Sequence, residues 1–164
     1  MQELQSLGEL CERLVRSARD AHLTVCTAES CTAGLVCAHI ADEPGSSAVL
    51  KGGAVTYWDE VKHGVLGVSQ ATLDSFSAVS SQTASEMAKG ARSLYNADIA
   101  VSTTGYAGPG GGTMKDPVGT VYMGLSRGSS VSTYRFVFDG DRAQVRSRAA
   151  YRALELLLYA VCGD

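Results

Sequence analysis

The chain has 164 residues, enough for one domain with a buried core, and we therefore expect a single domain over residues 1–164. A hydrophobic fraction of 45% and a charged fraction of 19% are ordinary for a globular protein. The net charge of −3, with scattered basic residues, argues against a nucleic-acid partner. Because no apolar run is long enough to cross a bilayer, no membrane partner is expected.

Cysteine and histidine usage indicates a reducing compartment and no metal site. The five cysteines form no C-x-x-C pair, and the three histidines form no H-E-x-x-H motif. The N-terminal segment MQELQSLGELCERL is amphipathic and acidic, unlike a signal or transit peptide. We therefore expect a cytoplasmic protein that uses neither a metal nor another cofactor.

Helical and strand-like patterns alternate along the chain. Apolar residues recur at a helical period in the N-terminal segment, and short apolar runs bounded by turn residues indicate strands. Ser30 precedes the second helical pattern and is a natural N-cap, since its hydroxyl could accept from a first-turn N–H. The expected helices are residues 2–20, 33–41, 59–66, 70–75, 79–95 and 140–161. The expected strands are residues 23–27, 49–58, 98–103, 118–126 and 131–138.

The order of these elements predicts the fold and the place of a ligand site. Helices between the first three strands indicate parallel β-α-β units, and the late hairpin adds an antiparallel member. We expect an α/β protein, a three-layer α/β/α sandwich on a mixed, mostly parallel five-stranded sheet. In such sheets the ligand site lies beyond the carboxyl ends of the parallel strands. Three polar clusters follow those ends: residues 29–32 (ESCT), 57–59 (YWD) and 103–105 (TTG).

A glycine-rich stretch follows the third of these strands, at residues 102–113. Its glycines and proline exclude a helix or a central strand, and they expose backbone N–H groups as anion-cradling loops do. A structureless connection between two strands is the alternative. The hydroxyl run of Ser102, Thr103 and Thr104 beside bare backbone favours a binding site.

A series of short motifs resembles the signatures of the CinA C-terminal domain family. The resemblance spans nearly the whole chain, and the motifs occur in the same order as in the family. They are residues 27–34 (TAESCTAG), 44–47 (PGSS), 55–62 (VTYWDEVK), 64–68 (GVLGV), 78–80 (AVS), 104–109 (TGYAGP), 117–122 (PVGTVY) and 138–142 (FDGDR), followed by Arg146.

The resemblance implies an amidohydrolase that converts nicotinamide mononucleotide to nicotinate mononucleotide and ammonia, so a small nucleotide is the expected partner. It also implies Ser47 as nucleophile with Lys62 as general base. Taken alone, Ser47 also fits a turn hydroxyl after Pro-Gly, and Lys62 an exposed helix lysine paired with Asp59. Lysine can act as a base where desolvation lowers its pKa, and no histidine lies in a recognisable motif.

Residues 29–31 offer a competing arrangement. Ser30 could point into the site and orient Lys62 or the substrate amide. Cys31, expected at a helix N-terminus where a thiolate is stabilised, could itself be the nucleophile with Lys62 and Glu29. A Glu29 carboxylate beside Lys62 would hold that lysine charged, which conflicts with its use as a neutral base.

Several further residues are candidates for binding the substrate. Arg142 and Arg146 lie one turn apart and could grip the phosphate, unless they are solvated or paired with neighbouring aspartates. The loop from Gly108 to Gly112 is the alternative cradle. Tyr57 and Trp58 could contact the pyridinium ring, or they could pack in the core. Thr104 and the Gly105 backbone could bind the carboxamide or its oxyanion.

The chain departs from the family pattern at three positions. Ala33 stands where the family usually has glycine, Tyr106 where it has an aliphatic residue, and Trp58-Asp59 where it has Ser-Asn. Trp58 and Tyr106 could fill space in the expected pocket. A non-catalytic nucleotide-binding module of the same fold is therefore the alternative function. The sequence leaves the oligomeric state open, and a homo-oligomer is compatible with it.

Overall fold

Residues 6–163, which the computed structural model describes, form one five-stranded mixed sheet with the strand order β2-β1-β3-β4-β5. The strands are β1 (Val25–Glu29), β2 (Leu50–Val55), β3 (Ile99–Gly105), β4 (Thr120–Arg127) and β5 (Ser130–Val137). β1 pairs in parallel with β2 and β3, whereas β4 pairs antiparallel with β3 and β5. Four strands therefore run in one direction (β2, β1, β3 and β5), and β4 runs in the opposite direction. The predicted mixed, mostly parallel sheet is confirmed.

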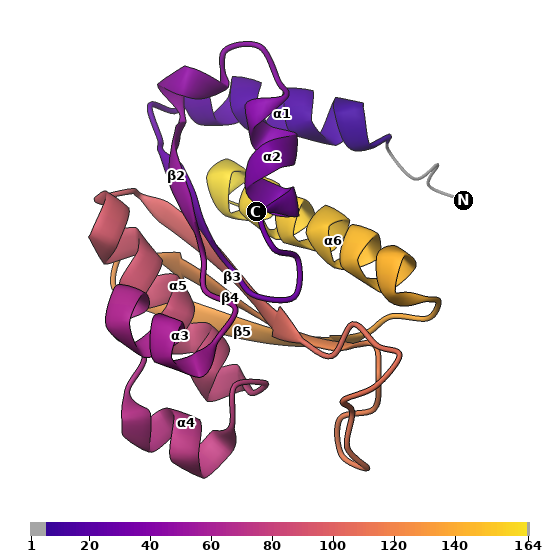
Figure 1. Cartoon of the computed structure of the whole chain (residues 1–164). Coiled ribbons are helices and arrows are strands. Elements are labelled where there is room, and N and C mark those ends of the chain that lie inside the picture. The colour runs from indigo at the N-terminus through magenta and orange to yellow at the C-terminus, as the bar shows by residue number, and fades with distance from the viewer. Residues whose placement is uncertain (1–5, 164) are drawn as a thin grey trace.

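Helices cover both faces of this sheet (Figure 1). One face carries α1 (Leu7–Asp20), α2 (Leu35–Ala41) and α6 (Arg142–Cys162). The other carries α3 (Asp59–Leu66), α4 (Gln70–Phe76) and α5 (Ser81–Tyr95), and α5 packs directly on the strands. The predicted three-layer α/β/α sandwich is confirmed. No helix among the described residues combines the length and the apolar character needed to cross a membrane.

Most expected elements form, with shifts of a few residues at their ends. α1 begins at Leu7 behind a Ser6 capping box, and the predicted start at residues 2–5 lies outside the described residues. β1 ends at Glu29 rather than at Thr27, because its pairing with β3 continues to the Glu29–Thr103 pair. β2 stops at Val55, three residues before the predicted end.

Alternation along the strands separates two cores of different side-chain size. Valine, isoleucine and leucine face α1 and α6, where long helices supply leucines to a large core. The face toward α5 is built from small residues such as Ala28, Ala54 and Ala100. Small side chains let α5 approach closely: a Cβ on Gly124 would lie 2.3 Å from the Ala84 carbonyl oxygen of α5. The position of α5 is therefore fixed by backbone contact.

Two helical glycines provide a matched test of this close packing. A Cβ on Gly90 of α5 would lie 1.9 Å from the Leu66 carbonyl oxygen at the end of α3, whereas a Cβ on Gly64 of α3 would meet nothing within 4 Å. We expect Gly90→Ala to lower the free energy of unfolding by about 1–3 kcal/mol, because the overpacking outweighs the better helix propensity of alanine. Gly64→Ala should raise it by up to about 1 kcal/mol. Urea titrations measure both, and equal effects would contradict the close approach.

Candidate active site

The polar clusters that follow β1, β2 and β3 meet at one edge of the sheet. The Ser30 amide donates to the Thr103 carbonyl at 2.9 Å, and the Thr56 amide donates to the Glu29 carbonyl at 2.8 Å. These bonds continue the ladder past the last paired residues, so the three strand ends stay in register where their polar side chains begin. The predicted convergence is confirmed.

Lys62 on α3 is a fully buried basic residue at this edge. Its side chain is 1% exposed, and Nζ lies 3.1 Å from Ser30 Oγ, 2.9 Å from the Thr56 carbonyl oxygen and 3.1 Å from the Tyr57 carbonyl oxygen. The alternative of an exposed helix lysine is therefore wrong. Asp59 does lie on the same helix, but its Oδ1 is 4.0 Å from Nζ and its side chain is mostly exposed.

Burial changes the proton affinity of this amine. Desolvation lowers the pKa of Lys62 below its ordinary value of 10.5, because the charged ammonium loses water that two carbonyls and a hydroxyl replace only in part. The negative charge of Asp59, and of Cys31 if ionised, acts in the opposite direction. The neutral amine is therefore more accessible at moderate pH than for a surface lysine.

Ser30 is free to face Lys62 because it does not cap a helix. α2 begins at Leu35 with Gly34 as its N-cap, and residues 31–34 form turns instead of the expected helix start. The predicted N-cap role of Ser30 is wrong, since its hydroxyl is four residues too early to reach the first free amides. Its Oγ contacts the Lys62 amine instead, in a position that is 9% exposed.

Glu29 takes over the capping of α2. Its carboxylate accepts from the amides of Gly34 (3.0 Å), Val36 (3.1 Å) and Cys37 (2.9 Å), and from the Thr32 hydroxyl (2.6 Å). A carboxylate at a helix N-terminus is favoured by the orientation of the backbone dipoles. Because its bonds go to the α2 side of the sheet, Glu29 is not the partner of Lys62. The conflict between a buried carboxylate and a neutral lysine is thereby removed.

The two arginines of α6 reach the same edge from the opposite face. Arg142 donates to the Gly108 carbonyl at 2.7 Å and to the Tyr57 hydroxyl at 2.8 Å. Arg146 donates to the carbonyls of Cys31 (3.0 Å) and Thr32 (3.1 Å). Arg142 is exposed and Arg146 half-buried, and the bonds that both form go to loop carbonyls and to Tyr57 instead of to neighbouring aspartates. Both guanidinium groups instead tie the loops after β1, β2 and β3 to α6.

Thr104 and Gly105 hold neighbouring segments in place. The Thr104 hydroxyl donates to the Ala78 carbonyl at 2.6 Å and its side chain is 1% exposed, so it anchors the segment before α5 to β3. A Cβ on Gly105 would lie 2.4 Å from the Thr120 carbonyl oxygen, so only glycine lets β4 approach there. Their contact with a substrate stays a prediction.

The family model described as CinA C-terminal domain matches residues 8–161 of the chain. The chain belongs to this family. This CinA domain is 43% identical over 149 residues to a putative competence-damage inducible protein of Thermoanaerobacter sp. (strain X514), and 50% identical over 133 residues to one of Clostridium acetobutylicum. The matches cover 91% and 81% of the chain but only 36% and 32% of those proteins. The chain thus spans about a third of the length of these curated relatives.

Solved structures of the CinA superfamily share the fold over their whole length. The superfamily protein of Klebsiella pneumoniae 700603 matches with a TM-score of 0.93 and 36% identity, covering 98% of this chain and 100% of that one. The competence/damage inducible protein of Agrobacterium tumefaciens matches with a TM-score of 0.91 and 39% identity, covering 99% of both chains.

Ser47 of this CinA domain lies at the wrong end of β2 to act with Lys62. It belongs to a short 3-10 helix, Ser46–Ala48, directly before β2, whereas Lys62 contacts the carbonyls directly after β2. At about 3.3 Å per residue, the intervening six-residue strand separates the two ends by roughly 20 Å. Figure 1 shows the segment before β2 and helix α3 at opposite ends of that strand. The predicted pairing of Ser47 with Lys62 is therefore wrong within one chain.

Cys31 does not have the environment of a reactive thiolate. It is 5% exposed and precedes α2 by four residues, so the expected stabilisation by a helix N-terminus is absent. Burial raises the pKa of its thiol to about 12. The prediction of an activated Cys31 is wrong, because the helix it was expected to begin starts later.

Trp58, one of the departures from the family pattern, does not fill the site. Its side chain is 68% exposed, and its backbone carbonyl accepts from the amides of Val61 and Lys62 at the start of α3. Tyr106, the other large departure, packs near Gly111 of the glycine-rich loop, where an added Cβ would lie 3.0 Å from its ring.

The thiol environments can be compared by alkylation. At neutral pH we expect iodoacetamide to modify the exposed Cys162 and to leave Cys31 unmodified in the folded protein, because the thiolate is the reacting species and Cys31 is both buried and protonated. Peptide mass spectrometry after a short exposure measures the ratio, and unfolding in urea provides the control in which both react. Modification of Cys31 as fast as Cys162 would restore the cysteine alternative.

Proposed function

We propose that this CinA domain is an amidohydrolase that hydrolyses the carboxamide of nicotinamide mononucleotide to nicotinate mononucleotide and ammonia, with Ser30 as nucleophile and Lys62 as general base. The reaction class and substrate come from the resemblance to the family. The observation that carries the assignment of residues is the 3.1 Å contact between Ser30 Oγ and the buried Lys62 Nζ.

The three partners of Lys62 suit a neutral amine. A neutral lysine has two N–H donors and one lone pair. The carbonyls of Thr56 and Tyr57 accept the two N–H groups, which leaves the lone pair for the hydroxyl hydrogen of Ser30. The same contacts satisfy an ammonium group that donates to all three oxygens, so the site accommodates the base before and after proton transfer.

The reaction then proceeds in two halves. Ser30 Oγ attacks the carboxamide carbon as its proton passes to Lys62, and Lys62 returns that proton to the nitrogen as the C–N bond breaks and ammonia leaves. The resulting ester on Ser30 is attacked by water, whose proton Lys62 accepts, and the product carboxylic acid departs as the hydroxyl is restored. One water is consumed for each ammonia released, and no metal or redox cofactor takes part.

Substitution of the three candidate nucleophiles, and of Lys62 as the proposed base, tests the assignment directly. Ser30→Ala and Lys62→Met should each lower ammonia release from nicotinamide mononucleotide by about a thousandfold or more, because each removes a group that acts in the transition state. Ser47→Ala and Cys31→Ala should retain activity within about tenfold, since the bonds of the Lys62 amine go to Ser30 and to the carbonyls of Thr56 and Tyr57.

Thermal unfolding of each variant controls for loss of structure in this series. If Ser47→Ala alone abolished turnover in a folded protein, Ser47 would be the nucleophile and a second chain would have to bring it to Lys62. Stabilisation of the wild-type protein by the nucleotide without any ammonia would support the non-catalytic binding module instead.

The pH dependence gives an independent test of the base. Since Lys62 must be neutral to accept the Ser30 proton, kcat/KM should rise with pH and level off above the Lys62 pKa, which burial holds below 10.5. Asp59→Asn removes the carboxylate that opposes this shift, so the rising limb should move to lower pH. Glu60→Gln, an exposed neighbour on α3, is the matched control and should leave the limb in place. If Asp59→Asn left the pH of this rise in kcat/KM unchanged, Lys62 would be excluded as the group whose titration causes it.

A further inference from the structure

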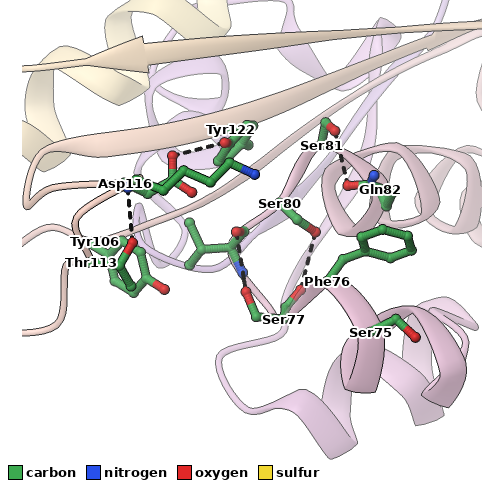
Figure 2. Close-up of a pocket in the computed structure, with 12 residues that line it drawn as sticks. Ser75, Phe76, Ser77, Ser80, Ser81, Gln82, Tyr106, Thr113, Asp116 and Tyr122 are labelled. Carbon is green, nitrogen blue, oxygen red and sulfur yellow. Dashed lines mark hydrogen bonds between the residues drawn. The ribbon is translucent and has the colours of Figure 1, made fainter.

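A hollow of about 380 Å³ lies at the edge of the sheet where β3 ends, and neither Ser30 nor Lys62 belongs to its wall (Figure 2). Three segments form it: residues 75–79 from the end of α4 and the turn after it, the first turn of α5, and residues 113–116 of the loop after β3. Tyr106 and Tyr122 complete the wall.

The hollow lies on the same face of the sheet as the Ser30–Lys62 pair. Thr104 of β3 points toward the segment before α5, and Tyr122 is its cross-strand partner on β4. Ser30 follows β1, which is the other neighbour of β3. Two strand spacings of about 4.8 Å place Tyr122 roughly 10 Å from the end of β1. The hollow and the Ser30–Lys62 pair thus lie at the same end of the sheet, two strands apart.

The wall of the hollow favours an anion with hydroxyl groups. Lys115 contributes a positive charge, and the serine and threonine residues of the wall offer hydroxyl partners. The first turn of α5 carries no acidic residue, and helix geometry leaves its leading amides, those of Ser81 and Gln82, without intrahelical acceptors. These donors come from separate elements, so they converge on the hollow only in the folded chain.

The single carboxylate in the wall is already neutralised. Asp116 Oδ1 accepts from Arg135 Nε at 2.9 Å and from the Tyr122 hydroxyl at 2.9 Å. The Asp116 amide donates to the Thr113 hydroxyl at 2.9 Å, and the Thr113 amide donates to the Asp116 carbonyl at 2.7 Å. Asp116 thus holds the loop in shape and forms its ion pair with Arg135, while Lys115 is exposed at the wall.

We propose that this hollow binds the ribose phosphate of the substrate, with Lys115 at the phosphate and the carboxamide directed toward Ser30. The inference rests on the proposed function for the identity of the nucleotide. It places the phosphate away from the two sites expected from the sequence, since Arg142 and Arg146 already donate to loop carbonyls and to Tyr57, and the lining loop residues follow the Gly108–Gly112 stretch.

A comparison of two substrates that differ only in the phosphate tests the hollow. Lys115→Met should lower the ratio of kcat/KM for nicotinamide mononucleotide to kcat/KM for nicotinamide riboside by roughly ten- to hundredfold, the size expected for one charge-assisted contact. Lys89→Met, an exposed lysine further along α5, is the matched control and should not move the ratio. A ratio unchanged by Lys115→Met, or lowered instead by Arg142→Met, would overturn the proposal.

Binding of ribose 5-phosphate separates failure of the hollow from failure of the proposed function. Ribose 5-phosphate should raise the melting temperature of the wild-type protein and of Lys89→Met, but not that of Lys115→Met. Lys115-dependent binding together with no ammonia from the wild type would refute the amidase and support the hollow. Ammonia release without Lys115-dependent binding would refute the hollow alone.

Discussion

Burial of the Lys62 amine is the constraint on which the site depends, because an amine removed from water must find partners in the protein. Its partners are two consecutive carbonyls after β2 and the hydroxyl after β1, so the lysine can be satisfied only where β1 and β2 lie side by side. The parallel pairing of these two strands, connected by the helix between them, therefore brings the Lys62 amine and the Ser30 hydroxyl into contact. Ser30 and Lys62 are 32 positions apart in the sequence, so the fold and not the local chain brings them together.

The α5 face makes this arrangement rigid. Small residues on the strands and glycines at two backbone contacts bring α5 and the end of α3 into direct contact with the layers below. A helix that carried larger side chains there would lift α3, and with it Lys62, away from the carbonyls after β2. The same close approach places the first turn of α5 beside Tyr106 and the loop after β3, where the hollow forms. Packing on one face thus positions both the Ser30–Lys62 contact and the hollow at the same edge of the sheet.

Sequence patterns predicted the fold class and the strand ends that carry polar residues, because these depend on local periodicity and on the topology of parallel sheets. The choice of Lys62 and Ser30 as site residues came from the family resemblance, and the structure places the two side chains in contact. Sequence patterns failed where one side chain took over the role of another. The carboxylate of Glu29 caps α2 from inside β1, which delays the helix, frees Ser30 and removes Cys31 from the helix start. They failed again for Ser47, since a motif does not reveal at which end of a strand its neighbours lie. Lys115 lies in none of the sequence motifs, so no pattern indicated it as a candidate.

Glu29 and Ser30 are consecutive, yet they serve opposite sides of the sheet: the carboxylate belongs to α2 and the hydroxyl to α3. Successive side chains of an extended chain point to opposite faces of the sheet. Whether a residue faces α2 or α3 therefore depends on whether its position along β1 is odd or even. An insertion or deletion of one residue in β1 would exchange the two. The carboxylate would then meet the Lys62 amine as an ion pair and the hydroxyl would lie beneath α2, so the chain would lose the Ser30–Lys62 contact and its helix cap together.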